Sequence, residues 1–182
     1  DAPEGFGNSW KWDCTTADAS PDTSARQQIS QIIEAQDLQH LNYGSNNPKD
    51  ITLSFWVKAT KPGINYIFIY HYDAADFIAH RYYINKSNTW EKKTITLTGS
   101  GAGTINNDNG AGLQITWFLY LGSTYTNGTY EENTWVDWTG TKYNMFEKQT
   151  NHADSTSNNF YLTGIQLEVG RNATEFDYRS YG

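Results

Sequence analysis

The chain has 182 residues, enough for one domain with a substantial core, so we expect a single domain over residues 1–182. Its formal net charge is −7, and its 13 Lys and Arg residues form no cluster, which excludes nucleic-acid binding through phosphates and docking on anionic lipid. No run approaches the roughly 20 apolar residues of a membrane span, so no membrane insertion is expected.

The composition favours an all-β protein. Aromatic residues make up 15% of the chain, led by Tyr and Trp, and the connecting segments are rich in Asn, Thr, Ser and Gly. The single cysteine, Cys14, excludes an internal disulfide, and we interpret it as a small buried apolar residue.

The first predicted strand covers residues 9–16, where Trp10, Trp12 and Cys14 alternate with polar residues. Residues 24–41 follow a polar loop. Their apolar residues fit either a strand or a helix, and both interpretations stay open. A turn cluster rich in Asn and Gly occupies residues 42–50.

Two clear strands are predicted at residues 51–58 and 65–72, separated by a Pro-Gly turn. The second strand is apolar or aromatic on both faces. One face is therefore expected to cover the core, and the other to meet a partner or a ligand.

Further strands are predicted at residues 79–84, 90–97, 113–121 and 160–169. In the last of these, odd-numbered residues from Tyr161 to Val169 form one face, and even-numbered residues from Phe160 to Glu168 form the other. The long polar segment between the last two strands contains Trp135, Trp138, Tyr143 and Phe146. Loops of such length are usually functional unless they hold short elements.

These segments give seven or eight strands with no helix at βαβ spacing and no internal repeat. The pattern predicts an all-β fold: an antiparallel two-sheet β-sandwich of jelly-roll type.

Motifs for catalysis or metal binding are weak. The acidic residues form no linked pair, and HExxH and GxSxG motifs are absent, so we expect no enzyme activity and no cofactor. His71 and His80 flank a short segment with two Asp residues, which fits either a metal site or an ordinary hydrogen-bonded turn. The Asn106–Asn109 loop offers oxygen ligands for a structural calcium ion or forms a simple turn.

Aromatic residues supply the best candidate site. If Ile67, Ile69 and the odd-numbered residues 113–119 fill the core, then a set of aromatic residues lies on the opposite face, overhung by two Trp residues of the long loop: Tyr70, Tyr72, Phe118, Tyr120, Trp135 and Trp138. Three interpretations remain open for this set: a ligand platform, packing beneath the loop, or a subunit interface. The other five Trp residues are predicted to lie in the core: Trp10, Trp12, Trp56, Trp90 and Trp117.

Five segments carry a resemblance to a known family. They are residues 51–60 (ITLSFWVKAT), 88–97 (NTWEKKTITL), 149–154 (QTNHAD), 163–170 (TGIQLEVG) and 176–182 (FDYRSYG). Together they resemble β-sandwich domains of phage tail-fibre and other virion proteins, notably of marine phages, and more distantly jelly-roll carbohydrate-binding modules. The resemblance carries no residue roles, so the site residues above come from this sequence.

The resemblance implies a non-enzymatic domain in a virion. The leading hypothesis is adhesion through a host-surface carbohydrate. The alternative is a structural module that contacts other virion subunits or forms a homo-oligomer without a small ligand, and a glycan-degrading domain is a third hypothesis. Because the chain starts at Asp1, and because similar proteins continue beyond the Arg-Ser-Tyr-Gly at 179–182, we expect a processed product or part of a longer virion protein.

Overall fold

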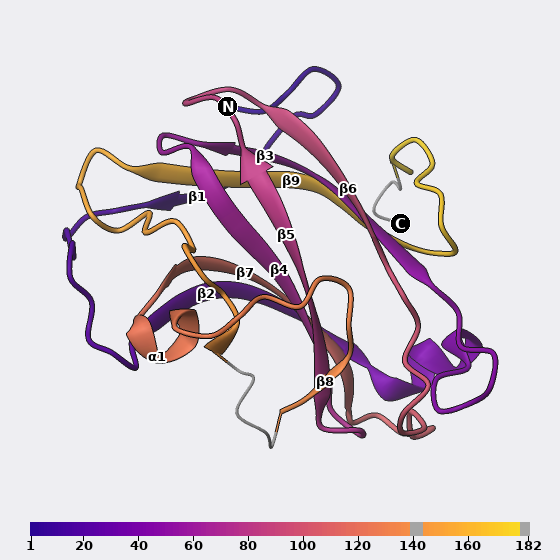
Figure 1. Cartoon of the computed structure of the whole chain (residues 1–182). Helices are drawn as coiled ribbons and strands as arrows, with labels where there is room; N and C mark the ends of the chain where they lie inside the picture. The colour runs from indigo at the N-terminus through magenta and orange to yellow at the C-terminus, as the bar shows by residue number, and fades with distance from the viewer. Residues whose placement is uncertain (139–143, 179–182) are drawn as a thin grey trace.

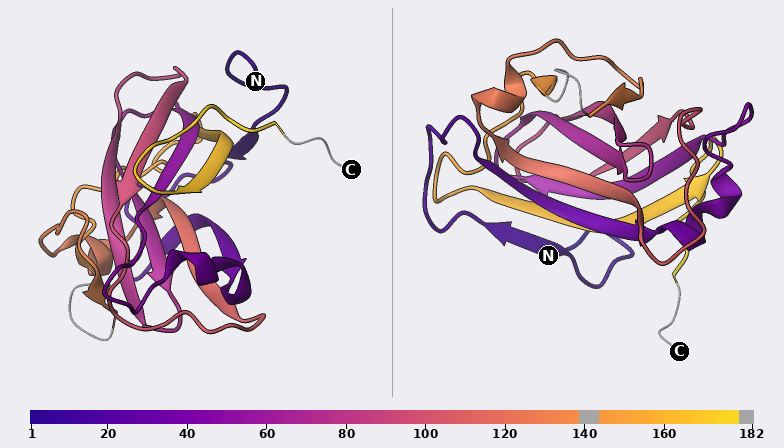
Figure 2. Two further views of the ribbon diagram at one scale, coloured as in Figure 1. Left: turned by 90° about the vertical axis from the view of Figure 1, so that its right-hand side faces the viewer. Right: turned by 90° about the horizontal axis from the view of Figure 1, so that it is seen from below.

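The computed structural model describes residues 1–138 and 144–178 (Figure 1). Tyr143 and the Arg179–Gly182 segment, both noted in the sequence, lie outside this range. The described strands form two antiparallel sheets that pack face to face as separate layers (Figure 2). The four-stranded sheet has the order β1 (Trp10–Asp13), β9 (Asn159–Val169), β3 (Ile51–Ala59), β6 (Glu91–Leu97). The five-stranded sheet has the order β2 (Arg26–Glu34), β7 (Ala111–Leu121), β4 (Gly63–His71), β5 (Asp76–Ile84), β8 (Val136–Asp137).

The strand pairing confirms the jelly-roll β-sandwich. β4 pairs with β5, β3 with β6, β2 with β7 and β1 with β9, all antiparallel. Apart from the two-residue β8, the strands therefore form nested pairs, as if one long hairpin had been wrapped into two sheets.

The ambiguous stretch at residues 24–41 contains both kinds of element. β2 ends at Glu34, and a 3₁₀ helix, η1 (Ala35–Leu41), follows. Ala35, Leu38 and Leu41 are buried against the main core, and Asn42 ends the helix with φ of 60°. None of the helices in the described residues is long and apolar enough to cross a membrane.

The hydrophobic core has two parts. The larger part lies between the sheets and includes Ile67, Ile69 and the odd-numbered residues 113–119, as predicted. The second part lies on the outer face of the five-stranded sheet, where Tyr66, Phe68 and Phe118 pack against Phe146 and other residues after β7. The outward aromatic residues of β4 therefore meet a segment of the same chain.

That covering segment, residues 122–138 and 144–158, is tied to the sheet by backbone hydrogen bonds. It holds a short helix, α1 (Ser123–Thr126), and the edge strand β8. The backbone N–H groups of Thr150 and His152 donate to the carbonyl groups of Ile64 and Leu119, at 2.7 and 3.0 Å. The segment is thus a fixed cover over one end of the sheet.

A bulge in β9 corrects the predicted alternation of this strand. Ser54 pairs with Gln166 but Trp56 pairs with Thr163, so two residues of β9 lie opposite one residue of β3. Phe160 and Leu162 face the core before the bulge, whereas Leu167 packs against the core after it. Gly164 has φ of +58°, in the left-handed region that glycine adopts without steric cost.

Of the five Trp residues predicted to lie in the core, Trp117 is fully buried and Trp12 packs partly against the core. Trp10 is 46% exposed, because it begins the short edge strand β1. Trp56 and Trp90 are half-buried. Trp90 lies on the surface beside Lys58, whose Nζ is 5.3 Å from its ring centroid.

Candidate ligand groove

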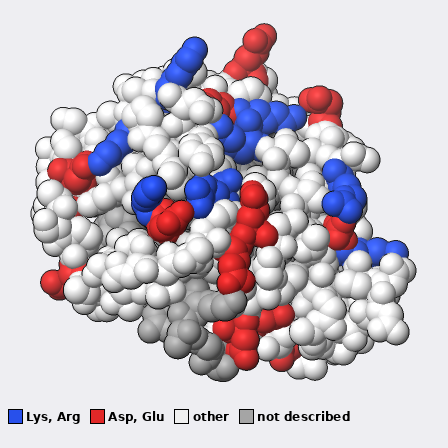
Figure 3. Space-filling view, viewed as in Figure 1, with Lys and Arg blue, Asp and Glu red and all other residues white. Residues whose placement is uncertain are grey.

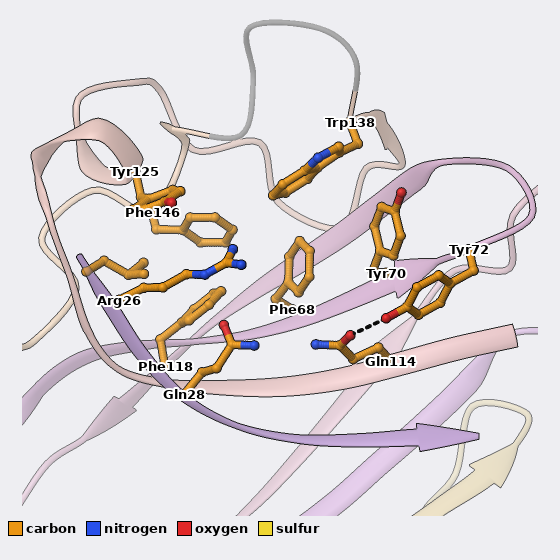
Figure 4. Close-up of a pocket in the computed structure, with 11 residues that line it drawn as sticks. Arg26, Gln28, Phe68, Tyr70, Tyr72, Gln114, Phe118, Tyr125, Trp138 and Phe146 are labelled. Carbon is orange, nitrogen blue, oxygen red and sulfur yellow. Dashed lines mark hydrogen bonds between the residues drawn. The ribbon is translucent and has the colours of Figure 1, made fainter. Parts of the chain in front are cut away.

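A groove with a volume of about 210 Å³ lies on the outer face of the five-stranded sheet. Strands β2, β7 and β4 form its floor, while the covering segment contributes Tyr125, Trp138 and Phe146 as walls (Figure 4). The groove combines an aromatic end, a polar floor and one cationic side chain.

The aromatic end is built from β4 and the residue after β8. Tyr70 follows Phe68 at the two-residue period of a strand, so both point outward. The Tyr70 ring lies edge-on to Tyr72, with centroids 4.9 Å apart, and edge-on to Trp138 at 5.7 Å. Tyr72 is 39% exposed, which leaves ring surface open at the mouth of the groove.

The polar floor consists of side chains held in place by mutual hydrogen bonds. Tyr72 Oη donates to Oε1 of Gln114 at 2.7 Å (Figure 4). Gln114 Nε2 lies 3.1 Å from Ser30 Oγ and 3.0 Å from Thr116 Oγ1. Gln28 Nε2 donates to the same Ser30 oxygen at 3.1 Å. The amides of Gln28 and Gln114 are therefore oriented before any ligand arrives.

Arg26 supplies the cationic side chain. It pairs with Leu121 at the start of β2, and its side chain extends into the groove toward the rings of Phe118 and Phe146 (Figure 4). The guanidinium carbon lies 5.9 Å from the centroid of the Tyr125 ring, within cation–π range.

The Tyr70 hydroxyl is held in its protonated form. Burial raises its pKa, and electrostatic interactions with Tyr72, Asp76 and Asp137 act in the same direction. A protonated phenol can donate a hydrogen bond as well as accept one, which suits recognition of hydroxyl groups.

Four of the six predicted site residues line this groove: Tyr70, Tyr72, Phe118 and Trp138. Phe118 is buried and forms part of the groove's base, with its ring centroid 4.9 Å from that of Phe146. Packing beneath the loop, one of the three interpretations of the sequence, therefore describes Phe118.

Tyr120 does not join the groove. The pairing of β2 with β7 shifts between Gln27 and Gln28, so that Gln27 lies opposite Tyr120 but Gln28 lies opposite Phe118. Because of this bulge, Leu121 lines the groove, whereas Tyr120 lies in a separate recess with Trp12 and Gln27.

Trp135 does not overhang the groove either. Residues on successive positions of β8 point to opposite sides, so Val136 and Trp138 face the outer cluster while Trp135 faces the main core. Its Nε1 donates to the carbonyl of Thr98 at 2.8 Å, and its ring packs edge-on against Tyr43.

The groove also contains four residues that the sequence pattern did not indicate: Arg26, Gln28, Gln114 and Tyr125. Arg26 and Gln28 lie in the stretch where strand and helix both fitted, so their common face was not visible. The polar alternation of Arg26, Gln28 and Ser30 would have indicated an outward strand face, had the strand interpretation been followed.

The sequence offered two candidate metal sites, one at His71 and His80 and one in the Asn106–Asn109 loop. The β4–β5 register pairs His71 with Asp76 and Ile67 with His80, so His71 and His80 are not opposite each other. Asn106 donates to Asp73, with its backbone N–H at 2.9 Å. Within residues 1–138 and 144–178, no group of three or more His, Cys, Asp or Glu side chains is arranged to hold a metal ion. Calcium at the Asn106–Asn109 loop stays a prediction.

No family model matches this chain, and neither the curated proteins nor the solved structures include a significant match. The fold places the chain in the class of jelly-roll β-sandwich proteins, and the groove is the feature from which a function can be argued.

Proposed function

We propose that this chain is a non-catalytic carbohydrate-binding domain, and that the groove on its five-stranded sheet holds the saccharide. The observation that supports this most is the combination of partly open aromatic rings, Tyr72 and Trp138, with the fixed amides of Gln28 and Gln114. Sugar rings have apolar C–H faces and a fringe of hydroxyl groups, so a site for them needs both kinds of surface.

The groove chemistry favours binding over hydrolysis. Its described lining holds Arg, Gln, Leu and aromatic side chains but no Asp or Glu. Glycoside hydrolysis usually requires two carboxyl groups on either side of the scissile bond.

The proposed setting is a phage virion, where the domain would recognise a host-surface glycan and contact other virion subunits. This part of the proposal is supported by the resemblance of the five sequence segments to phage tail-fibre domains. One of those segments, residues 163–170, forms much of β9 and contributes no residue to the groove. The resemblance therefore bears on the setting of the domain and not on the groove.

A glycan array followed by calorimetric titration tests the binding proposal. We expect the chain to bind a defined saccharide and Tyr72→Ala to weaken that binding by about ten-fold, the loss typical of one stacking contact. Trp10→Ala is the matched control, because Trp10 is a comparably exposed aromatic residue on the other sheet. Full affinity in the Tyr72→Ala variant would contradict the proposed site.

A second function, assembly with another copy of this chain, is favoured by one edge of the four-stranded sheet, where β9 has a partner strand on one side only. Beyond Leu162, β9 pairs with β3 but not with β1. Near this edge, three apolar side chains are exposed on β2 and β9: Ile32 at 48%, Ile165 at 45% and Val169 at 47%. Unpaired apolar edges of this kind are sites of strand pairing between molecules.

Sedimentation analysis of the wild type and of an Ile165→Lys, Val169→Lys double variant tests the assembly function. Association that the double variant abolishes would support it, because charged residues on an edge oppose strand pairing. A wild-type chain that stays monomeric at high concentration would contradict it.

A further inference from the structure

Arg26 is exceptional among the arginines that the structure describes. The guanidinium groups of Arg81 and Arg171 lie 3.1 Å from Glu147 and 3.3 Å from Asp50, respectively. Arg26 has no carboxylate within 4.0 Å among residues 1–138 and 144–178, and no hydrogen-bond acceptor for its side chain. Arg26 is also exposed, so its guanidinium is solvated and remains accessible to an incoming anion.

The position of Arg26 points to a ligand. Its side chain is exposed on the edge strand β2, and it lies along the groove toward Phe118 and Phe146 (Figure 4). An anion bound in the groove would therefore meet this positive charge beside the aromatic wall of Tyr125.

We propose that the saccharide is acidic, and that Arg26 binds its anionic group, a uronic-acid carboxylate, while its neutral rings lie against Tyr72 and Trp138. This inference rests on the proposed function of the groove. A guanidinium presents two parallel N–H donors that match the two oxygens of a carboxylate, so Arg26 would fix the orientation of the saccharide as well as its charge.

The rest of the groove fits a saccharide with few charges. The aromatic end has the Asp76 and Asp137 charges near Tyr70, and the whole chain carries a net charge of −7. A dense polyanion would be repelled by these negative charges, whereas a glycan with one carboxylate among neutral sugars would meet an attractive charge at Arg26, the one cationic residue in the described lining of the groove. The groove would therefore favour glycans in which acidic sugars are separated by neutral ones.

The test compares three versions of one oligosaccharide: a form with a single uronic acid, its carboxyl-reduced neutral form, and a neutral form carrying one sulfate. Calorimetric titration is carried out with the wild type, Arg26→Gln, Arg26→Lys and Arg171→Gln. Arg171 is a matched control because it is an exposed arginine outside the groove. Thermal unfolding confirms that each variant is folded.

We expect the wild type to prefer the uronic acid over the reduced form by about ten-fold, the effect of a charged hydrogen-bonded pair. Arg26→Gln should remove this preference, Arg26→Lys should restore part of it, and Arg171→Gln should keep it. The same dependence on Arg26 with the sulfated form alone would support anion recognition and assign the anion as a sulfate.

The two proposals fail in different ways. Equal affinity of the wild type for the acidic and reduced forms, with binding still weakened by Tyr72→Ala, would overturn the acidic ligand and leave the carbohydrate groove standing. A preference that persists in Arg26→Gln would also overturn the role of Arg26. Absence of binding to every form and to the whole array would overturn both proposals.

Discussion

His152 joins the covering segment to the sheet beneath it. Its side chain is fully buried, its Nε2 lies 2.8 Å from Oδ1 of Asn65, and its ring packs edge-on against Phe160. Burial lowers its pKa to about 4, and the positive charge of Lys61 adds to this effect while Asp154 opposes it. The residue is therefore neutral in the folded chain at neutral pH.

This burial predicts an acid-sensitive fold. In the unfolded chain a histidine has a pKa near 6.5, so protons bind the unfolded state first and favour unfolding. The contribution of neutral His152 is complete above about pH 6.5 and is lost as the pH falls toward 4, on the order of 3 kcal/mol in total. Urea unfolding at pH 7, 6 and 5 measures it.

His152→Gln is the control for the pH prediction, because an amide of similar size does not titrate. We expect its free energy of unfolding to change less between pH 7 and 5 than that of the wild type, whatever its absolute stability. The lowered pKa values of Glu91 and Asp154 act below this window. An unchanged pH dependence in His152→Gln would show that another group is responsible.

Single residues also show where prediction from the sequence stopped. The sequence predicts Tyr70, Tyr72 and Trp138 in one site, because strand alternation and loop position are visible locally. Arg26 could not be placed, because its strand was ambiguous, and Trp135 was misplaced, because the two-residue β8 that separates it from Trp138 has no recognisable pattern.

At the level of elements, bulges explain most of the differences between the predicted and observed strand faces. The sequence pattern predicts strict alternation through β9 and β7, but both strands contain a register shift, at Gly164 in β9 and near Leu119 in β7. A bulge depends on the partner strand, so alternation within one strand does not reveal it. The glycine in β9 was the only local sign, since an isolated glycine in a strand often marks a bulge.

Gly164→Ala is predicted to destabilise the sandwich. An added Cβ would lie 2.6 Å from the Phe6 ring and 3.2 Å from Trp56, and the φ of +58° disfavours any residue with a Cβ. We expect a loss of about 1–3 kcal/mol in the free energy of unfolding, measured in urea. Gly7→Ala, where a Cβ has no neighbour within 4 Å, is the matched control and should change stability little. Equal effects of both substitutions would contradict the role given to the bulge.

For the whole molecule, the fold class was predictable and the topology in detail was not. Alternating segments without intervening helices predicted the two-sheet jelly roll, and the strand pairs confirm it. The pairing of β1 with β9 joins the two ends of the chain, and contacts over such sequence distances leave no local pattern. For the covering segment, the sequence left function, short elements and packing on the aromatic residues all open, and the structure shows both short elements and packing on the outer sheet face.

The distribution of charged side chains over the surface also affects binding. In Figure 3 the acidic and basic side chains are interspersed on the visible face. The groove is distinguished by its aromatic residues and by Arg26. Binding should depend on local contacts, and raising the ionic strength should weaken an acidic ligand more than its neutral form.

The crystal structure of the chain with the best-binding oligosaccharide tests the central claim most directly. The account predicts one sugar ring against Tyr72 and Trp138, hydroxyl groups within hydrogen-bond distance of Gln28 or Gln114, and an anionic group at Arg26. A saccharide bound elsewhere, for example in the recess beside Tyr120, with the groove left empty, would contradict it.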